Sequence, residues 1–391
     1  MTSRETVMDC LPEPGALLVG RVWMPGTPAG PSVISVHAGR VYDLSVYFPT
    51  VSEFLNQGHP VATVLQARAN APSSSLQSVL ETSPCLGGSG AAPTLLAPCD
   101  LQAIKACGVT FMTSLVERII EERAGGDSQR AEQIRSELQD GIGTDLRGIV
   151  PGSAAAAQLK QALLQRQMWS QYLEVAIGPD AEVFTKAQPL SAVGHGMEIG
   201  VHPASRWNNP EPEVVLAVNR HGRIVGATLG NDVNLRDVEG RSALLLGQAK
   251  DNNGSCAIGP FIRLFDESFT LDTVRACTVS LRVHGADGFH MSASSDMAQI
   301  SRDPEELVRQ TFNAHHTYPD GLMLFLGTMF APTTDRDAPG LGFTHRVGDL
   351  VEISTPALGR LVNRINHTDR IPPWTFGIAD LMRNLAARRL L

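Results

Sequence analysis

Short apolar runs joined by turn sequences dominate the chain from about residue 170 onward, and they constrain its fold more than any other feature. EVVLAV and RIVGATLG flank the turn-rich tetrad NRHG, and VSLRV and FHMSAS flank HGADG. Apolar runs bounded by such turns predict antiparallel hairpins. The 36 glycines and 25 prolines agree with many short strands, because these residues supply the backbone angles of tight connections.

The first 170 residues predict a more mixed structure. Residues 1–95 alternate short apolar runs with Gly/Pro breaks, which indicates a smaller, β-rich N-terminal domain. Residues 96–391 then form the predicted catalytic domain, beginning with a strand at AIKACGVTF and a helix at SLVERIIEERAGG that Gly125 and Gly126 end. A helical insertion over about 124–168 should cover one side of the core. The expected fold class is therefore mixed, β-rich α+β.

Composition excludes several kinds of partner and compartment. The formal net charge of -8 repels a phosphate backbone, so we expect no nucleic-acid partner. No stretch of about 18 apolar residues occurs, so we expect no contact with a membrane. Six scattered cysteines without a CxxC pair indicate reduced thiols, and the start of the chain lacks a secretory pattern. The expected location is the cytoplasm.

Two glutamates at the start of the EVVLAV run are the first candidates for chemistry. Glu211 and Glu213 are two residues apart, so the pleat of a strand points both carboxylates to one face. A solvated strand edge with paired acids is the ordinary interpretation of this pattern alone. A third carboxylate would favour a hard divalent cation instead, since such cations prefer oxygen ligands.

Asp232 supplies that third carboxylate if the predicted hairpin forms, because the turn at NRHG returns the chain toward the glutamates. An aspartate in GNDVNLRD is also common in turns and helix caps for local hydrogen-bonding reasons. Lys250 follows in a Gly/Asn-rich stretch, where a lone lysine is usually a surface charge.

The order of these motifs resembles the fumarylacetoacetate hydrolase superfamily over residues of about 100–366. Each piece is weak alone, but the ordered set is specific. In chain order the pieces are Glu211-Pro-Glu213, Asn231-Asp232 through Arg236-Asp237, Lys250 ahead of Gly259-Pro260, Gly327-Thr328, Gly348-Asp349-Leu350-Val351-Glu352-Ile353 and Leu361-Val362-Asn363-Arg364.

The resemblance implies a β-rich fold around Mg²⁺ or Mn²⁺ held by Glu211, Glu213 and Asp232. The cation would chelate the carboxylate and 2-oxo group of a small pyruvate-like substrate. By the same resemblance Lys250 faces the substrate, and Thr328 with Gly327 contacts its carboxylate. Arg236 would support the ligands from behind.

A departure from the family pattern points to one reaction. Hydrolases of the family carry Gly-x-Asn-Tyr followed by a His-x-x-Glu pair, whereas this chain has Gly108-Val109-Thr110-Phe111 and then Ser114 and Glu117. Serine does not act as a base near neutral pH without a partner, so we expect no activation of water by this pair. The GVTF, KDNNGSCAIGP and FLGTMFAPTTDRDAPGLGF segments resemble the branch that dehydrates 2-keto-3-deoxy sugar acids.

The function that this branch implies is a hydro-lyase of pentose catabolism. A 2-keto-3-deoxypentonate of the D-arabinonate or D-xylonate type would lose water to give 2,5-dioxopentanoate, with Glu117 and Lys250 dividing proton transfer and charge stabilisation between them. The alternatives are a hydrolase that splits a 2,4-dioxo acid to release pyruvate and a metabolite-binding protein without catalysis.

Selectivity for a sugar acid and the assembly of the chain complete the predictions. Ser205, Arg206 and Asn234 lie near the ligands in sequence and are candidates for contacting the far end of the substrate, although Arg206 would also balance the acidic cluster. The superfamily resemblance implies a homodimer or homotetramer.

Overall fold

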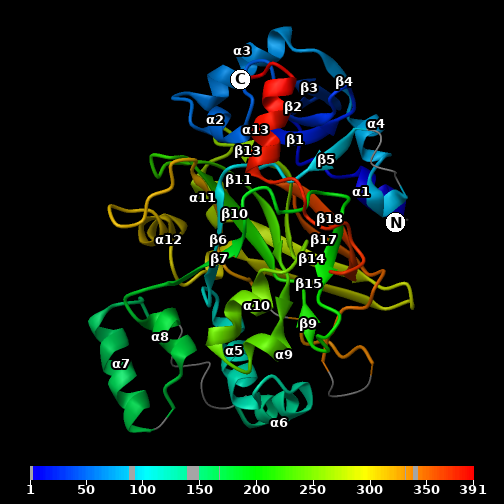
Figure 1. Cartoon of the computed structure of the whole chain (residues 1–391). Coiled ribbons are helices and arrows are strands. Elements are labelled where there is room, and N and C mark those ends of the chain that lie inside the picture. The colour runs from blue at the N-terminus through cyan, green and yellow to red at the C-terminus, as the bar shows by residue number, and fades with distance from the viewer. Residues whose placement is uncertain (1–2, 88–92, 139–148, 167, 331, 338–341) are drawn as a thin grey trace.

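The structure is a computed structural model that describes residues 3–87, 93–138, 149–166, 168–330, 332–337 and 342–391. Its architecture is mixed α+β, which confirms the expected fold class (Figure 1). In Figure 1 the N-terminal strands and the C-terminal helix lie at the upper end, the sheets fill the middle, and a group of helices forms the lower end.

The larger sheet contains strands from both ends of the chain. Its members are β1 (Leu18–Met24), β2 (Gly30–His37), β3 (Arg40–Asp43), β4 (Ser73–Ser75), β5 (Thr94–Leu96), β6 (Ala103–Gly108), β7 (Glu182–Ala187), β10 (Pro212–Val218), β11 (Ile224–Asp232), β13 (Cys256–Leu264) and β16 (Leu322–Phe325). Their order is β4-β3-β2-β1-β13-β11-β10-β16-β6-β7, and β5 also pairs with β1. Because β1 pairs with β13, the sheet runs across the domain boundary expected at residue 95, and that boundary stays a prediction.

A second sheet packs against the middle of the first. Its strands are β8 (Glu198–Val201), β14 (Thr278–His284), β15 (His290–Asp296), β17 (Leu350–Thr355) and β18 (Gly359–His367), in the order β15-β14-β17-β18-β8. A short ladder of β9 (Asn208–Asn209) and β12 (Asn234–Leu235) continues beside the β10–β11 pair. Both predicted hairpins are confirmed, because β10 pairs with β11 and β14 pairs with β15 in antiparallel register.

The central strand β10 is buried on both faces, and its side chains alternate between two cores. Val214, Leu216 and Val218 join the core between the two sheets, whereas Val215 and Ala217 join the core on the opposite face of the larger sheet. This alternation is the period of two expected for a strand. A strand so deeply placed positions the residues at its end rigidly.

Helices cover the rims of the sheets. They are α1 (Ser3–Met8), α2 (Val51–Leu55), α3 (Pro60–Asn70), α4 (Leu76–Leu80), α5 (Met112–Ala124), α6 (Ser128–Leu138), α7 (Ala154–Gln165), α8 (Gln171–Ile177), α9 (Arg236–Glu239), α10 (Leu246–Lys250), α11 (Leu271–Arg275), α12 (Pro304–Thr311) and α13 (Ile378–Ala387). None of the helices in these ranges is long and apolar enough to cross a membrane.

The helical segment expected over about 124–168 begins at the end of α5. Gly125 ends α5 in the left-handed conformation with φ 63°, as its sequence position predicted. α6 and α7 follow, and the Ser153 hydroxyl caps α7 by accepting a hydrogen bond from the Ala156 amide at 3.2 Å. Residues 139–148 and 167 of this range lie outside the described residues. In Figure 1 these helices form the lower end of the molecule, below the β10–β11 pair.

Candidate metal centre and active site

The end of the β10–β11 hairpin brings three carboxylates together. Pro212 pairs with Asn231, and the Asp232 amide donates to the Glu211 carbonyl at 3.0 Å. One carboxylate oxygen from each of Glu211, Glu213 and Asp232 lies within 4.8 Å of the others. All three side chains are almost fully buried, at 2%, 1% and 1% exposure. The hairpin therefore concentrates negative charge where water screens it poorly.

Each carboxylate has one oxygen held from outside the cluster. The Arg118 guanidinium on α5 donates to Glu211 Oε1, and the Gly327 amide donates to Glu213 Oε2 at 2.7 Å. Lys186 Nζ on β7 lies 3.0 Å from Asp232 Oδ1 as an ion pair. These contacts orient the three groups, so that the remaining oxygen of each is available inside the cluster.

The three remaining oxygens converge on a position for a cation. Lys250 Nζ donates to Glu211 Oε2 at 2.5 Å and to Asp232 Oδ2 at 2.9 Å. Glu213 Oε1 is buried and has no hydrogen-bond partner among the described residues. A buried carboxylate oxygen without a partner is costly, and three oxygen donors suit a hard divalent cation. The residues present therefore fit Mg²⁺ or Mn²⁺.

The protonation states reflect this excess of negative charge. Burial, and then the Asp232 and Glu211 charges, raise the pKa of Glu213 well above its ordinary value. Burial by itself would lower the pKa of Lys250, but the same two carboxylates outweigh it and hold that pKa above its ordinary value. The lysine is therefore charged, whereas at Glu213 the Lys250 charge and the Gly327 amide offset only part of the effect of burial and of the neighbouring negative charges.

Glu117, on α5, lies outside the cluster of three carboxylates. Its own carboxylate instead contacts two arginines. Arg135 Nε and Nη2 donate to its two oxygens at 3.0 and 2.9 Å, and Arg236 Nη2 donates to Oε2 at 2.9 Å. Burial alone would raise the pKa of Glu117, but Arg135 and Arg236 outweigh it and hold that pKa below its ordinary value. A carboxylate held in this way is a weak acceptor of a proton.

Ser114 is turned toward its own helix. Its hydroxyl donates to the Phe111 carbonyl at 2.8 Å, and the side chain is buried. In the described parts of the chain, no histidine hydrogen-bonds to or pairs with Glu211, Glu213 or Asp232. Within those parts, neither Ser114 nor a histidine is therefore arranged to activate water beside the cluster.

The residues expected at the substrate carboxylate lie at the end of β16. Gly327 adopts φ 98° and directs its amide to Glu213, and the Thr328 hydroxyl donates to the Phe330 carbonyl at 3.0 Å. A Cβ at position 327 would come 2.0 Å from Thr110 Oγ1, so only glycine fits this approach. The turn holds Thr328 next to a ligand candidate.

Arg236 supports the cluster through other charged groups. Its Nε donates to Glu121 Oε1 at 2.5 Å, and its guanidinium lies 4.2 Å over the Trp207 ring. Glu121 in turn accepts a hydrogen bond from Arg118 at 2.8 Å, and Arg118 contacts Glu211. Arg236 thus reaches the carboxylates through two intermediate side chains, Glu121 and Arg118.

The three selectivity candidates divide into two groups. The Ser205 hydroxyl and the Arg206 amide donate to the two oxygens of Asp237 at 2.7 and 2.8 Å, and Ser205 and Asp237 border a groove of about 1010 Å³. Asn234 is instead fully buried, opposite Asn209 in the β9–β12 ladder. Both amide atoms of Asn234 have no hydrogen-bond partner among the described residues, so its amide has capacity for a polar group.

Four residues near the cluster were not predicted from the sequence. Arg118 and Lys186 hold the outer carboxylate oxygens, and Glu239 Oε2 lies 3.0 Å from Arg118 Nη1. The fourth, Glu182, begins β7 beside β6. The signal that was available is that Glu182 and Lys186 stand four residues apart in a short strand sequence, EVFTKA, where charged side chains are uncommon.

Glu182 is a half-buried carboxyl that faces this charged region. Its Oε2 lies over Gly108, where a Cβ would approach within 1.9 Å, so the glycine makes room for it. Burial, and then the Glu239 charge, raise the pKa of Glu182 from 4.5 to about 7, although Arg118 and Lys250 oppose the rise. A carboxyl with a pKa near neutrality is suited to proton transfer.

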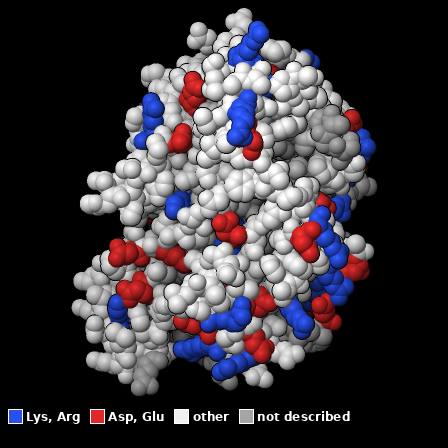
Figure 2. Space-filling model, viewed as in Figure 1, with Lys and Arg blue, Asp and Glu red and all other residues white. Residues whose placement is uncertain are grey.

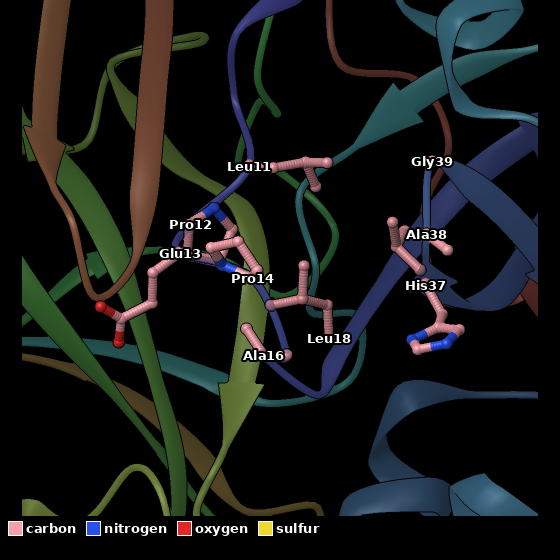
Figure 3. Close-up of a pocket in the computed structure, with 11 residues that line it drawn as sticks. Leu11, Pro12, Glu13, Pro14, Ala16, Leu18, His37, Ala38 and Gly39 are labelled. Carbon is pink, nitrogen blue, oxygen red and sulfur yellow. The ribbon is translucent and has the colours of Figure 1, made fainter.

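Two further surfaces are less suited to chemistry. Acidic and basic side chains are mixed over the lower part of the face in Figure 2, where α5 and α6 lie in Figure 1. A pocket of about 350 Å³ is lined by residues 11–16, 18 and 36–39 (Figure 3). Its Glu13 carboxylate pairs with Arg263 at 2.7 Å, so the one acidic side chain labelled in Figure 3 is already neutralised.

Comparisons with known proteins place the chain among related sequences and folds. A family model described as fumarylacetoacetate (FAA) hydrolase C-terminal matches residues 154–366. A 2-dehydro-3-deoxy-D-arabinonate dehydratase from Saccharolobus solfataricus is 32% identical over 193 residues, which are 49% of this chain and 60% of that protein. A probable 2-keto-3-deoxyxylonate dehydratase from Haloferax volcanii is 31% identical over 201 residues, 51% of this chain and 65% of that protein. Each match spans less than two thirds of the relative's length.

Solved structures share the fold at lower sequence identity. A hexagonal crystal form of 2-keto-3-deoxyarabinonate dehydratase has a TM-score of 0.60 and 21% identity, covering 89% of this chain and 98% of that one. A structure of 2-keto-3-deoxy-D-arabinonate dehydratase complexed with magnesium and 2,5-dioxopentanoate has a TM-score of 0.59 and 20% identity, covering 90% and 99%. At these identities the likeness establishes the fold.

Proposed function

Because this chain belongs to the fumarylacetoacetate hydrolase family, we propose that it is a metal-dependent hydro-lyase of 2-keto-3-deoxy sugar acids. Its substrate would be a 2-keto-3-deoxypentonate of the D-arabinonate or D-xylonate type, and its product 2,5-dioxopentanoate. Both curated relatives are named as dehydratases of such acids. A solved structure of the same fold is described with magnesium and 2,5-dioxopentanoate.

The observation that carries the proposal is the arrangement around the three carboxylates. They offer three inward oxygens for a cation, yet Ser114 stands where family hydrolases have a water-activating histidine, and its hydroxyl is bound to the Phe111 carbonyl. Breaking a carbon–carbon bond by hydrolysis needs an activated water, whereas removing a hydroxyl group does not. The arrangement therefore favours elimination over hydrolysis.

The inward oxygens of Glu211, Glu213 and Asp232 would hold Mg²⁺ or Mn²⁺. When bound, such a cation polarises the C2 carbonyl of a 2-oxo acid and so makes the C3 hydrogens more acidic. The outer contacts with Arg118, Lys186 and the Gly327 amide leave the carboxylates in place for this purpose.

Glu182 is the residue that we assign to proton transfer. It faces the charged region from β7, and its pKa of about 7 leaves part of its population ionised and able to accept the C3 proton near neutral pH. Glu117, expected in this role from the sequence, is held by Arg135 and Arg236. We therefore propose that Glu117 fixes the arginines, while Glu182 moves the proton.

Lys250 and the Gly327–Thr328 turn complete the site. The Lys250 ammonium is charged and stabilises the negative charge that develops at the C2 oxygen as the C3 proton leaves. Thr328 borders the ligand Glu213 through Gly327 and would contact the substrate carboxylate. The buried amide of Asn234, the groove that Ser205 borders and the neighbouring Arg206 are candidates for the hydroxylated end.

The reaction balances without an added reactant. The C3 proton and the C4 hydroxyl group leave as water, and a double bond forms between C3 and C4. A proton then moves from C5 to C3, and the resulting enol becomes the C5 aldehyde when its hydroxyl proton moves to C4. The product retains all five carbons, and the net change is the loss of one water.

The test is product analysis by NMR with purified protein and Mg²⁺. The panel contains 2-keto-3-deoxypentonates and 2,4-dioxo acids, with EDTA and the Glu211→Gln variant as controls. We expect 2,5-dioxopentanoate from a pentonate, and both controls should suppress it. Pyruvate plus a second acid would identify a hydrolase. Binding without turnover of any panel member would identify a metabolite-binding protein.

A further inference from the structure

Two buried lysines contact opposite oxygens of the same aspartate, and we infer that they act on metal binding in opposite directions. Lys186 is a positioning residue that holds Asp232 ready for the cation. Lys250 is an internal counter-ion that occupies the cation's position until the metal displaces it. This inference rests on the metal site of the proposed function.

The two lysines match closely in burial and in their distance from Asp232, although each contacts a different oxygen of it. Lys186 Nζ lies 3.0 Å from Asp232 Oδ1, and Lys250 Nζ lies 2.9 Å from Asp232 Oδ2. Their side chains are 0% and 2% exposed. An argument from charge and distance alone would assign them the same effect on a nearby cation, so the difference between them must come from geometry.

Lys186 is fixed behind Asp232 by the main chain. Its ammonium donates to the Val233 carbonyl at 3.2 Å and to the Lys250 carbonyl, in addition to its pairing with the aspartate. Together with a hydrogen bond to the Ser255 hydroxyl at 3.4 Å, the two carbonyls match the three donors of an ammonium group, and the contact with Asp232 is an ion pair, so Lys186 has no donor left for the inner oxygen. It therefore orients Asp232 without entering the cluster.

Lys250 lies inside the cluster instead. Its Nζ bridges Glu211 Oε2 and Asp232 Oδ2, two of the three oxygens that would hold a divalent cation. An ammonium and a divalent cation at one position repel each other strongly in a buried site, so one of them has to leave. The lysine is attached through a flexible stem and can move aside.

The main chain of Lys250 stays in place while its side chain moves. Its carbonyl accepts hydrogen bonds from Lys186 Nζ and from the Ser255 hydroxyl, the latter at 2.8 Å. Metal binding would therefore move only the ammonium, which then becomes available to a substrate beside the metal. In the metal-free protein the same ammonium offsets the negative charge of the carboxylates and so stabilises the three-carboxylate cluster.

The experiment measures Mg²⁺ and Mn²⁺ affinity by titration calorimetry on the full chain, without substrate. Lys250→Met should bind the metal on the order of tenfold more tightly, because the competing charge is gone. Lys186→Met should bind it about tenfold more weakly, as is usual when a residue that orients a ligand is lost. Lys105→Met is the matched control, since Lys105 contacts Thr185 on the sheet and should leave the affinity unchanged.

Thermal melting provides a second measurement on the same variants. Metal-free Lys250→Met should melt at a lower temperature than the wild type, and saturating Mg²⁺ should raise its melting temperature by more than it raises that of the wild type. If Lys186→Met does not fold, Lys186→Arg replaces it, and this variant should retain part of the lost affinity because it keeps the charge.

The outcomes of these measurements distinguish a failure of this inference from a failure of the proposed function. An equal increase in affinity for both methionine variants would mean that charge alone matters and would overturn the inference, as would an unchanged affinity in Lys250→Met. A wild type that binds Mg²⁺ with the predicted opposite variant effects but dehydrates no pentonate would refute the proposed function and leave this inference standing. If the wild type dehydrates a pentonate but both methionine variants change the metal affinity in the same direction, the proposed function stands and this inference is refuted.

Discussion

Replacing Glu182 by glutamine should stabilise the protein above neutral pH and at the same time remove most of its activity. The cause is the pKa of Glu182, which burial and the Glu239 charge raise from 4.5 to about 7. Each pKa unit is worth about 1.4 kcal/mol, so the ionised carboxylate costs roughly 3 kcal/mol of stability in the folded chain. Glutamine has the same shape and no charge.

The sign of the pH dependence follows from the direction of the pKa change. Between pH 4.5 and about 7 the folded chain keeps a proton that the unfolded chain releases, so the free energy of unfolding falls as the pH rises through this range. Above this range the loss is constant. The advantage of Glu182→Gln over the wild type should therefore grow from under about 1 kcal/mol at pH 5 to roughly 3 kcal/mol at pH 8.

Urea denaturation of both proteins at these two pH values, with EDTA to exclude bound metal, measures the difference. The contributions of other titrating groups cancel between variant and wild type. In a separate assay with saturating Mg²⁺ and no EDTA, the rate of dehydration should fall by about 10²- to 10⁴-fold, the usual loss when a general base is removed. A pH-independent difference in stability would show that Glu182 is not the perturbed carboxyl.

Glu117→Gln is the matched control, because it changes the other candidate carboxyl in the same way. Glu117 is ion-paired with Arg135 and Arg236, so its loss should destabilise the fold by about 2 to 3 kcal/mol and leave more activity than Glu182→Gln does. A folded Glu117→Gln protein that is less active than Glu182→Gln would assign the proton transfer to Glu117 and refute the argument from the structure.

Two further variants test other parts of the site, and a third tests the buried ion pair between Arg336 and Asp349. Glu211→Ala should abolish Mg²⁺ binding in calorimetry, because it removes one of three inward oxygens, and binding within about threefold of the wild type would exclude this residue as a ligand. Ser114→Ala should change kcat by less than about threefold, since the lost hydroxyl hydrogen-bonds to the Phe111 carbonyl at the start of its own helix; a larger loss at unchanged stability would give Ser114 a role in the reaction. Arg336→Met should lower the free energy of unfolding by about 3 kcal/mol, because it leaves Asp349 buried without its guanidinium, and a neutral effect in urea denaturation would contradict that account.

The hairpin that carries the candidate ligands was predictable from residues close in sequence. Turn residues at 219–222 and apolar runs on both sides predicted the pairing of β10 with β11, and the period of two predicted that Glu211 and Glu213 share a face. These features depend on local backbone geometry, which neighbouring residues largely determine. The same holds for the end of α5 at Gly125.

The role of each charged residue at the site was not predictable from neighbouring residues in the sequence. Glu117 matched a family motif, yet the structure places it between Arg135 and Arg236. Glu182 and Lys186 match no motif, and they reach the cluster because β7 is the last strand of the larger sheet beside β6. The pairing of β6 with β7 joins segments separated by the whole helical region, and the sequence carries no local signal for such a contact.

By itself, the sequence determined the class of fold, the hairpin with its three carboxylates and the absence of the family's histidine at position 114. Only the tertiary structure decided which oxygen of each carboxylate is held from outside and which one faces the cluster. It did so by bringing Arg118, Lys186 and the Gly327 amide to the outer oxygens, from α5, β7 and the end of β16. The physical reason is burial: in a region without water, each charge takes the nearest available partner, and that partner is set by chain packing rather than by position in the sequence.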